Sequence, residues 1–251
     1  MIGNVRPALA VLVLIAAAAT SGCVTLPPNA PRSAKDPLER WNRGVYRFND
    51  VLDRAVAKPV ARSYVRVVPK PMRTGVSNFF ANLETPSVMM NDALEGHFKA
   101  AASDLGRFLL DSTVGIAGLL DPATAVGLDH NTADFGVTLG TWGVHPGPFI
   151  ELPLLGPSDL RDAPAAVVDT YANPTQYVSD TAAKYSLWGV NLVRKRADLL
   201  PLDATLKTVF DPYAFVRDAY LQHRAYEVST SRGDDSDDSP DDPDSGGASP
   251  R

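Results

Sequence analysis

The stretch from Asp36 to Arg54, DPLERWNRGVYRFNDVLDR, predicts an amphipathic helix and decides the fold class. Its apolar residues recur at intervals of three and four, which places them on one face of a helix. They are Leu38, Trp41, Val45, Phe48 and Leu52. Asp36 is expected to be the N-cap of a capping box completed by Glu39. Pro59 is expected to end the helix, because proline disfavours helical backbone in the residue before it.

The rest of the chain reads as further short helices separated by prolines. Proline is favoured in the first turn of a helix, so several prolines are each expected to begin one. They are Pro59, Pro71, Pro86, Pro164, Pro174 and Pro212. The longest predicted helix is Thr175–Leu200. No segment sustains a strict alternation of apolar and polar residues, so few strands are expected. The predicted fold class is all-α.

Residues 140–157 break this pattern because they combine glycine and proline with large apolar side chains. Loops are normally polar, so this segment is interpreted as an apolar hairpin or extended loop. It either fills the core or faces a membrane and is mobile. Gly143 and Gly147 are expected to act as hinges, since glycine reaches backbone conformations that other residues avoid. The candidate loop residues are Gly140, Trp142, Gly143, Gly147, Pro148 and Phe149.

Ser158 follows this loop and is expected to cap a helix that presents Arg161 and Asp162 together. Two interpretations of that pair stay open. The pair is either a surface ion pair beside a capped turn, or the polar lining of a path for lipid headgroups.

Residues 1–22 are expected to be a signal peptide, with Cys23 as the anchor of the mature chain. The apolar run at 8–19 is 12 residues long, too short to cross a bilayer but the length of a signal-peptide core. Small residues then lead into Cys23, the only cysteine, in an arrangement that resembles the lipobox of bacterial lipoproteins. The resemblance implies acyl chains on Cys23, and each buried methylene contributes about 0.8 kcal/mol to membrane binding. An ordinary secreted protein with a stray cysteine is the alternative.

Three segments are expected after the signal peptide: a lipidated linker at 23–35, a helical domain at 36–228 and a tail at 229–251. The tail holds seven aspartates and two arginines. Such a polar, acidic segment is expected to be disordered. Its net charge of −5 accounts for the formal charge of the whole chain. The domain is therefore close to neutral, which argues against nucleic acid as a partner.

No pattern of catalytic or metal-binding residues stands out. The four histidines are isolated from one another, without zinc-ligand spacing. A nucleophile elbow and the glycine-rich phosphate loops are absent from the sequence. An acylated Cys23 could not serve as a thiol nucleophile. We therefore predict no enzymatic activity, no metal and no cofactor beyond the acyl chains.

The segment from Asp36 to about Tyr226 resembles the MlaA (VacJ) family of outer-membrane lipoproteins. The motifs that carry the resemblance are DPLE, WNR and YRFN within 36–49, SNFFANL at 77–83, GIAGLLD at 115–121, LPLLGPS at 152–158 and DPY at 211–213. The resemblance implies a ring of short amphipathic helices with a central amphipathic channel. That ring is expected to lie in the membrane plane, in the inner leaflet of the outer membrane, facing the periplasm. Val24 after the lipobox cysteine also favours the outer membrane, because aspartate there commonly signals retention in the inner membrane.

The resemblance also implies a function. Such proteins remove mislocalised phospholipids from the outer leaflet and pass them to a periplasmic lipid-carrier protein, which maintains lipid asymmetry. They associate with trimeric porins. On this interpretation the loop at 140–148 gates the lipid path, and Arg161 and Asp162 line it. Two alternatives stay open, a structural tether that docks porins and a lipid-hydrolysing enzyme.

Overall fold

The computed structural model describes residues 36–233, and it is predominantly helical. In chain order, the elements are α2 (Glu39–Leu52), η1 (Asp53–Ala57), α3 (Lys58–Val67), α4 (Lys70–Leu94), α5 (Phe98–Thr113), α6 (Pro122–Ala125), α7 (Phe135–Thr141), β1 (Phe149–Leu152), β2 (Gly156–Asp159), α8 (Asp162–Ala172), η2 (Pro174–Tyr177), α9 (Thr181–Asp198), α10 (Leu202–Thr208) and α11 (Pro212–Arg232). In the part of the chain that the structure describes, the strands form one two-stranded hairpin. The predicted all-α class is confirmed.

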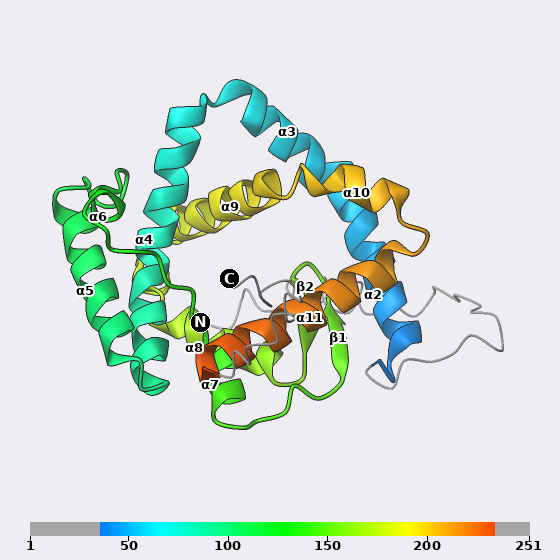
Figure 1. Ribbon diagram of the computed structural model, residues 1–251. Helices are drawn as coiled ribbons and strands as arrows, with labels where there is room; N and C mark the ends of the chain where they lie inside the picture. The colour runs from blue at the N-terminus through cyan, green and yellow to red at the C-terminus, as the bar shows by residue number, and fades with distance from the viewer. Residues whose placement is uncertain (1–35, 234–251) are drawn as a thin grey trace, which may run out of the picture.

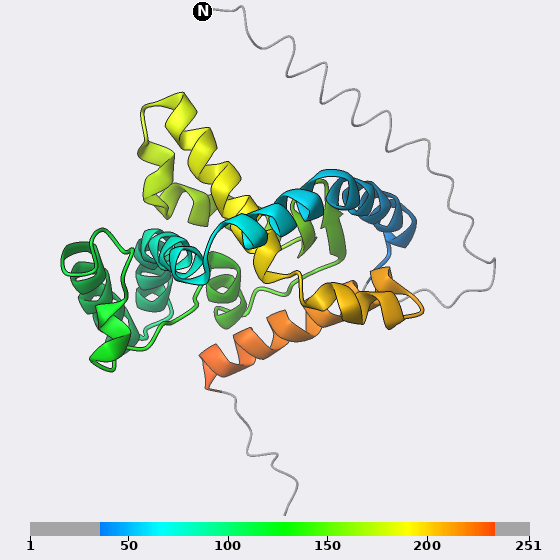
Figure 2. The same cartoon turned by 90° about the horizontal axis from the view of Figure 1, so that it is seen from above.

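The helices follow a closed outline, which we call the frame (Figure 1). In that view α4, α3, α2 and α11 form its sides and α9 crosses within it. Seen from above, α8, η2 and the first half of α9 project on one side of this frame, and α11 borders the other (Figure 2). The β1–β2 hairpin lies between α2 and α11, because β1 contacts α2 and β2 contacts α11. The arrangement agrees with the predicted ring.

The first helix continues past the point where the sequence predicted its end. Pro59 is the second residue of α3, and the π-helix η1 joins α2 to α3 without a break. The N–H of Lys58 donates to the carbonyl of Asp53, five residues back. Proline has no N–H and crowds the preceding turn, and the wider π turn accommodates it. The prediction that Pro59 ends the helix is therefore wrong.

Two further helix boundaries differ from prediction. Pro86 lies inside α4, so it does not begin a helix, and α4 at 25 residues is longer than any other helix described. The predicted helix Thr175–Leu200 is divided, because η2 ends at Tyr177 and Asp180 caps α9 by accepting the N–H of Ala183 at 2.6 Å.

The predicted capping box at Asp36 is also wrong. The helix begins at Glu39 after Leu38, with no side-chain cap. Asp36 is instead fully buried, where it accepts hydrogen bonds from Asn42 at 2.8 Å, from Arg217 at 3.3 Å and from the hydroxyl of Tyr213. This contact fastens the start of the described chain to α11.

More polar than apolar side chains are buried in the described part of the chain, an unusual balance for a water-soluble core. Large apolar side chains are exposed instead, among them Trp41, Val51, Val56, Val60 and Val67 along α2–α3. None of the described helices is both long and apolar enough to cross a membrane. Helix α11 continues to Arg232, so the predicted tail boundary at 229 is wrong by four residues. Cys23, the linker and residues 234–251 lie outside the described residues.

Candidate functional site

The loop at 140–157 ends in a β-hairpin, as the sequence predicted. Its strands pair antiparallel, with Phe149 opposite Asp159 and Leu152 opposite Gly156. The tip between them is apolar and exposed: Leu154 is 52% exposed and Leu155 is 74% exposed. Leu154 has φ +67°, a left-handed conformation that is strained for a leucine. The tip is thus an exposed apolar turn with one residue in a strained conformation.

Two asparagines on one face of α2 bind the backbone of the hairpin, and we call them the asparagine clamps. Asn42 donates to the carbonyl of Phe149 at 3.0 Å and accepts the N–H of Glu151 at 2.9 Å. One amide side chain therefore makes both bonds that a neighbouring strand would make. Asn49, seven residues further along the helix, donates to the carbonyl of Leu152 at 3.0 Å and accepts the N–H of Leu154 at 2.8 Å.

Glu151 lies under the hairpin and is 2% exposed. Asn49 donates to one of its carboxylate oxygens at 3.1 Å, and the other oxygen has no hydrogen-bond partner. Burial raises the pKa of Glu151 to about 7, and the hydrogen bond from Asn49 offsets only part of this effect. The contact between α2 and the hairpin therefore contains a carboxyl group that titrates near neutral pH.

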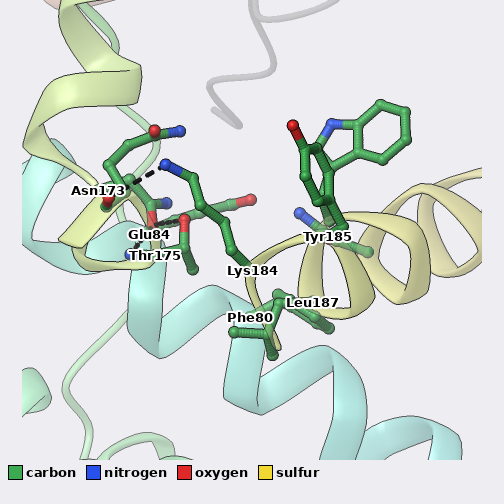
Figure 3. Close-up of a pocket in the computed structure, with 10 residues that line it drawn as sticks. Phe80, Glu84, Asn173, Thr175, Lys184, Tyr185 and Leu187 are labelled. Atoms are coloured by element: carbon green, nitrogen blue, oxygen red, sulfur yellow. Dashed lines mark hydrogen bonds between the residues drawn. The ribbon is translucent and has the colours of Figure 1, made fainter. Parts of the chain in front are cut away.

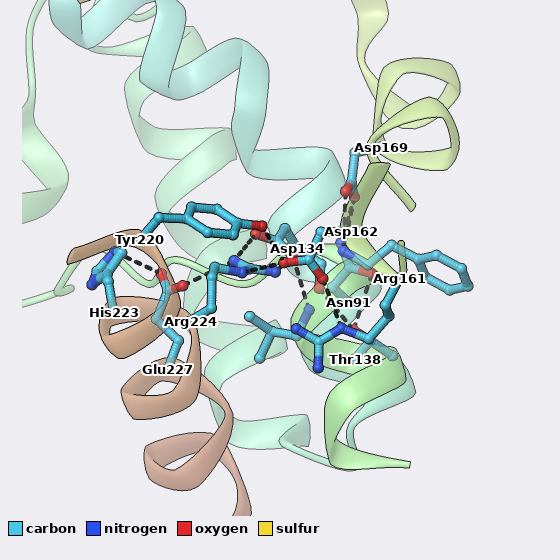
Figure 4. Close-up of polar contacts among 12 residues, drawn as sticks. Asn91, Asp134, Thr138, Arg161, Asp162, Asp169, Tyr220, His223, Arg224 and Glu227 are labelled. Carbon is cyan, nitrogen blue, oxygen red and sulfur yellow. Dashed lines mark hydrogen bonds and ion pairs between the residues drawn. The ribbon is translucent and has the colours of Figure 1, made fainter. Parts of the chain in front are cut away.

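The base of the hairpin is fixed by a buried charge network (Figure 4). Asp162 pairs with Arg161 at 2.7 Å and with Arg224 of α11 at 2.6 Å, and it accepts the hydroxyl of Tyr220 at 2.8 Å. Burial opposes ionisation of Asp162, but the two arginines outweigh it and lower the pKa. Arg224 also pairs with Asp134, the N-cap of α7, at 2.6 Å.

This network corrects two predictions. Arg161 is 6% exposed and Asp162 is 8% exposed, so they are neither a surface ion pair nor the lining of an open path. Ser158, which was expected to cap the following helix, lies in β2, and Asp159 accepts the N–H groups of Arg161 and Asp162 instead. These residues position the hairpin.

The predicted loop residues divide into positions that favour glycine for its backbone conformation and positions that pack closely. Gly143 has φ +95° and Gly147 has φ +72°, left-handed conformations that favour glycine, and their role as hinges stays a prediction. A Cβ on Gly140 would collide with Val228 and Arg161, so this glycine allows α7 and α11 to approach closely. Pro148 accepts the N–H of Leu160 at 3.2 Å through its carbonyl.

The two aromatic candidates behave differently. Trp142 is 54% exposed and its indole N–H donates to the carbonyl of Leu94 at 3.2 Å, so its ring is free to contact an apolar ligand. Phe149 is fully buried between the rings of Tyr213 and Tyr220, with centroid distances of 6.2 and 6.0 Å. Phe149, a candidate residue of the loop, therefore fills the core and is not exposed to a ligand.

A cavity of about 280 Å³ lies between α4, η2 and α9 (Figure 3). Aromatic side chains border it on α4 and α9, namely Phe80, Tyr185 and Trp188. Its polar lining consists of Glu84, Asn173, Thr175, Gln176, Lys184 and Asn191. Lys184 donates to the carbonyl of Gln176 at 3.1 Å, and Glu84 pairs with Lys195 at 3.1 Å. The cavity therefore offers both signs of charge beside aromatic rings.

A second cavity of about 190 Å³ shares Phe80 and Leu187 with the first. Its remaining lining is almost wholly apolar: Val76, Phe79, Leu119, Ser186 and Val190. A cavity with a mixed polar and apolar lining and an almost wholly apolar cavity thus lie next to each other between α4 and α9. Such a pair matches the two chemical halves of an amphipathic molecule.

Sequence reasoning missed both these cavities and the asparagine clamps. The cavities are lined by α4 and by residues about a hundred positions later in the chain. No local sequence pattern predicts that these segments lie side by side. The clamps had a weak signal, because Asn42 and Asn49 are seven residues apart and so share one helix face.

Comparisons with known proteins decide the family. The family model described as MlaA lipoprotein matches residues 34–227. The chain belongs to the MlaA lipoprotein family. A relative from Escherichia coli K12, named intermembrane phospholipid transport system lipoprotein MlaA, is 36% identical over 76% of this chain and 77% of its own. A relative with the same name from Haemophilus influenzae is 35% identical over 87% of this chain and 90% of its own.

A solved structure agrees with these sequence relatives. It comes from work on the structural basis for maintenance of bacterial outer membrane lipid asymmetry, and it matches with a TM-score of 0.70 at 37% identity. The match covers 78% of this chain and all of that one. The MlaA family region includes the hairpin, both asparagine clamps and both cavities, and it excludes Cys23 and the tail.

Proposed function

We propose that this chain is a lipid-anchored outer-membrane protein that removes mislocalised phospholipids from the outer leaflet and passes them to a periplasmic carrier, maintaining outer-membrane lipid asymmetry. The observation that carries the proposal is the pair of adjoining cavities between α4 and α9, one lined by charged, polar and aromatic side chains and the other almost wholly apolar. Membership of a family whose named relatives are intermembrane phospholipid transport lipoproteins supports it.

The cavity chemistry suits a phospholipid. Lys184 can contact a phosphate, and Glu84 can contact an ammonium group, while Tyr185 and Trp188 offer faces to a cationic headgroup. The apolar chamber beyond Phe80 and Leu187 suits the start of an acyl chain. No acid–base or nucleophile–base pair is needed for such transport, so we propose a transporter rather than a hydrolase.

The surface of the frame suits the membrane interface. Exposed apolar residues along α2–α3 are accompanied by exposed basic residues at Arg40, Arg47, Arg54, Arg62 and Arg66. A helix with an apolar face and a basic face lies in the plane of an anionic membrane surface. The acyl chains expected on Cys23 would add a permanent anchor. We propose a trimeric porin as the partner that holds the frame within the membrane.

In this proposal the hairpin gates the lipid path. Its tip, Leu154 and Leu155, is apolar and exposed, its strands are clamped to α2, and Gly143 and Gly147 supply hinges at its base. Release of the clamps would let the tip move while the network around Asp162 keeps the base in place.

The experiment is complementation of a null strain, read as resistance to detergent, with two matched variants of α9. Leu187→Asp places a charge where the two cavities meet, and we expect loss of function at normal protein levels. Leu192→Asp makes the same change at an exposed leucine of the same helix that lines neither cavity, and we expect full function. Equal complementation by both variants would refute a lipid path between α4 and α9.

Two further measurements separate the alternative functions. Phospholipid that copurifies with the protein, and is lost in Leu187→Asp, distinguishes transport from a structural tether that only docks porins. Recovery of labelled phospholipid unchanged after incubation distinguishes transport from hydrolysis, whereas release of a labelled fatty acid or headgroup would favour an enzyme.

A further inference from the structure

The turn between α4 and α5 gathers groups that ligate metals. Asp92, Glu95 and His97 each bring one ligand atom to within 4.8 Å of the others. Gly96, with φ +84°, reverses the chain between Glu95 and His97, and the N–H of His97 donates to the carbonyl of Asp92 at 2.8 Å. The three side chains therefore converge because of the shape of the turn.

These carboxylates are buried without a compensating cation among the described residues. Asp92 is 5% exposed, Asp104 of α5 is 1% exposed and the side chain of Glu95 is 2% exposed. Their one ion-pair partner within the described chain is His97, at 3.5 Å from Glu95. Buried carboxylates are normally paired with a basic group or with a metal ion. The turn therefore has a deficit of positive charge.

Two buried oxygens also lack a hydrogen-bond partner. One carboxylate oxygen of Asp92 and one of Asp104 are unpaired, and the two carboxyl groups lie next to each other. Asn131 donates to the other oxygen of Asp104 at 3.2 Å, which holds that side chain in orientation. Two buried carboxyl groups placed in this way need either a proton shared between them or a cation that both can contact.

We propose that Asp92, Glu95 and His97, with Asp104 beside them, form a binding site for a divalent cation, and that the cation is zinc. One imidazole together with carboxylates is a ligand set that zinc accepts and that calcium or magnesium, which prefer oxygen alone, does not select. The side chain of His97 is 41% exposed, so the site has a route from solvent. A tetrahedral zinc site has ligand atoms about 3.4 Å apart, so the side chains close slightly around the ion.

The surroundings of Glu95 support the site. Thr138 of α7 donates to one of its carboxylate oxygens at 2.8 Å, and Ser231 near the end of α11 donates to the other. Such outer partners orient a metal ligand. A bound ion would therefore join α4 and α5 to the C-terminal end of α11, just before the acidic tail.

The test uses the full mature lipoprotein in detergent, stripped with a chelator and titrated with zinc alone by calorimetry. We expect one zinc per chain. His97→Ala and Asp92→Asn should each weaken binding by tenfold or more. His223→Ala is the matched control, because it removes another histidine paired with a glutamate, at 3.3 Å, far from the turn in sequence, and it should leave binding unchanged.

Thermal unfolding gives an independent readout. Zinc should raise the Tm of the parent protein and of His223→Ala, but not that of His97→Ala. If the two aspartates only share a proton, the parent protein will take up no zinc and its Tm will not respond to zinc or chelator, which overturns the proposal. Equal uptake by all variants, or uptake of magnesium in preference to zinc, overturns it as well.

Discussion

Asn42 and Glu151 are joined by a hydrogen bond of 2.9 Å from a strand N–H to a helix side chain, across 109 residues of sequence. With its amide nitrogen on the carbonyl of Phe149, Asn42 takes the place of a third strand beside β1. The same amide also donates to Asp36, so one side chain connects the hairpin, α2 and the contact with α11.

We expect Asn42→Ala to lower the free energy of unfolding by about 3 kcal/mol, because it leaves several buried polar groups without partners. It should also raise hydrogen exchange in β1. The measurement is urea denaturation together with exchange mass spectrometry. Asn78→Ala, which removes one long exposed hydrogen bond of 3.5 Å, is the control and should change little. A β1 that stays protected in Asn42→Ala would show that the clamp is dispensable.

The buried carboxyl of Glu151 makes stability depend on pH. Its pKa is about 7 in the folded protein against an ordinary value of 4.5, so the folded state binds more protons between these values. The free energy of unfolding should therefore fall by roughly 3 kcal/mol as pH rises from about 4.5 to about 7, and this contribution should be constant outside that range. Glu151→Gln should remove that slope. Identical pH profiles for the two proteins would contradict this assignment.

Glycines at two positions should respond to alanine with opposite signs. Gly143 has φ +95° and open space around its Cβ position, so Gly143→Ala should destabilise the fold by about 1 kcal/mol through backbone strain alone. Gly44 also has open space but lies inside α2, so Gly44→Ala should stabilise by about 0.5–1 kcal/mol. Thermal unfolding of both variants checks this pair, and the same sign for both would be evidence against a strained hinge.

We expect Cys23→Ser to abolish membrane anchoring, because the acyl chains implied by the lipobox would be absent. Cell fractionation measures it. Mature-sized Cys23→Ser protein in the outer membrane would rule out the lipoprotein interpretation.

Truncation should be tolerated after Gly233 but not after Tyr226. Ser231 donates to Glu95 and Arg232 donates to the carbonyl of Gly140, so the shorter protein loses contacts with the α4–α5 turn and α7. We expect the protein ending at Gly233 to complement a null strain in the detergent assay and the protein ending at Tyr226 to fail or accumulate poorly. Failure of the longer protein at normal levels would assign a function to the acidic tail.

Local patterns in the sequence predicted the helical class and the apolar hairpin, because periodicity and glycine–proline content are local properties. They failed where the position of a residue depends on contacts with residues far away in the sequence. Asp36 reads as a helix cap but is bound by Tyr213 and Arg217, about 180 positions away. The local sequence is compatible with a surface charge at Asp162, but in the structure Arg224 and Tyr220 of α11 contact this carboxylate and it is buried.

The prediction that Pro59 ends the first helix failed for a related reason, whereas Pro71, Pro174 and Pro212 do stand in the first turn of a helix. A proline in a sequence breaks a helix only if no neighbouring turn can absorb the lost hydrogen bond, and the π turn before Pro59 does absorb it. The cavities between α4 and α9 could not be predicted at all, since they depend on how the frame closes.

The buried contacts of this frame are mainly hydrogen bonds and ion pairs. The strength of such contacts depends less on the surrounding solvent than the strength of a hydrophobic core does. Hydrocarbon gives apolar side chains no reason to cluster, so a conventional core would lose its driving force there. Buried charge pairs such as Asp162 with Arg224 keep their attraction and are little screened by salt. If the proposed function holds, the chain would fold in an aqueous compartment and keep the same shape once its outer surface entered lipid.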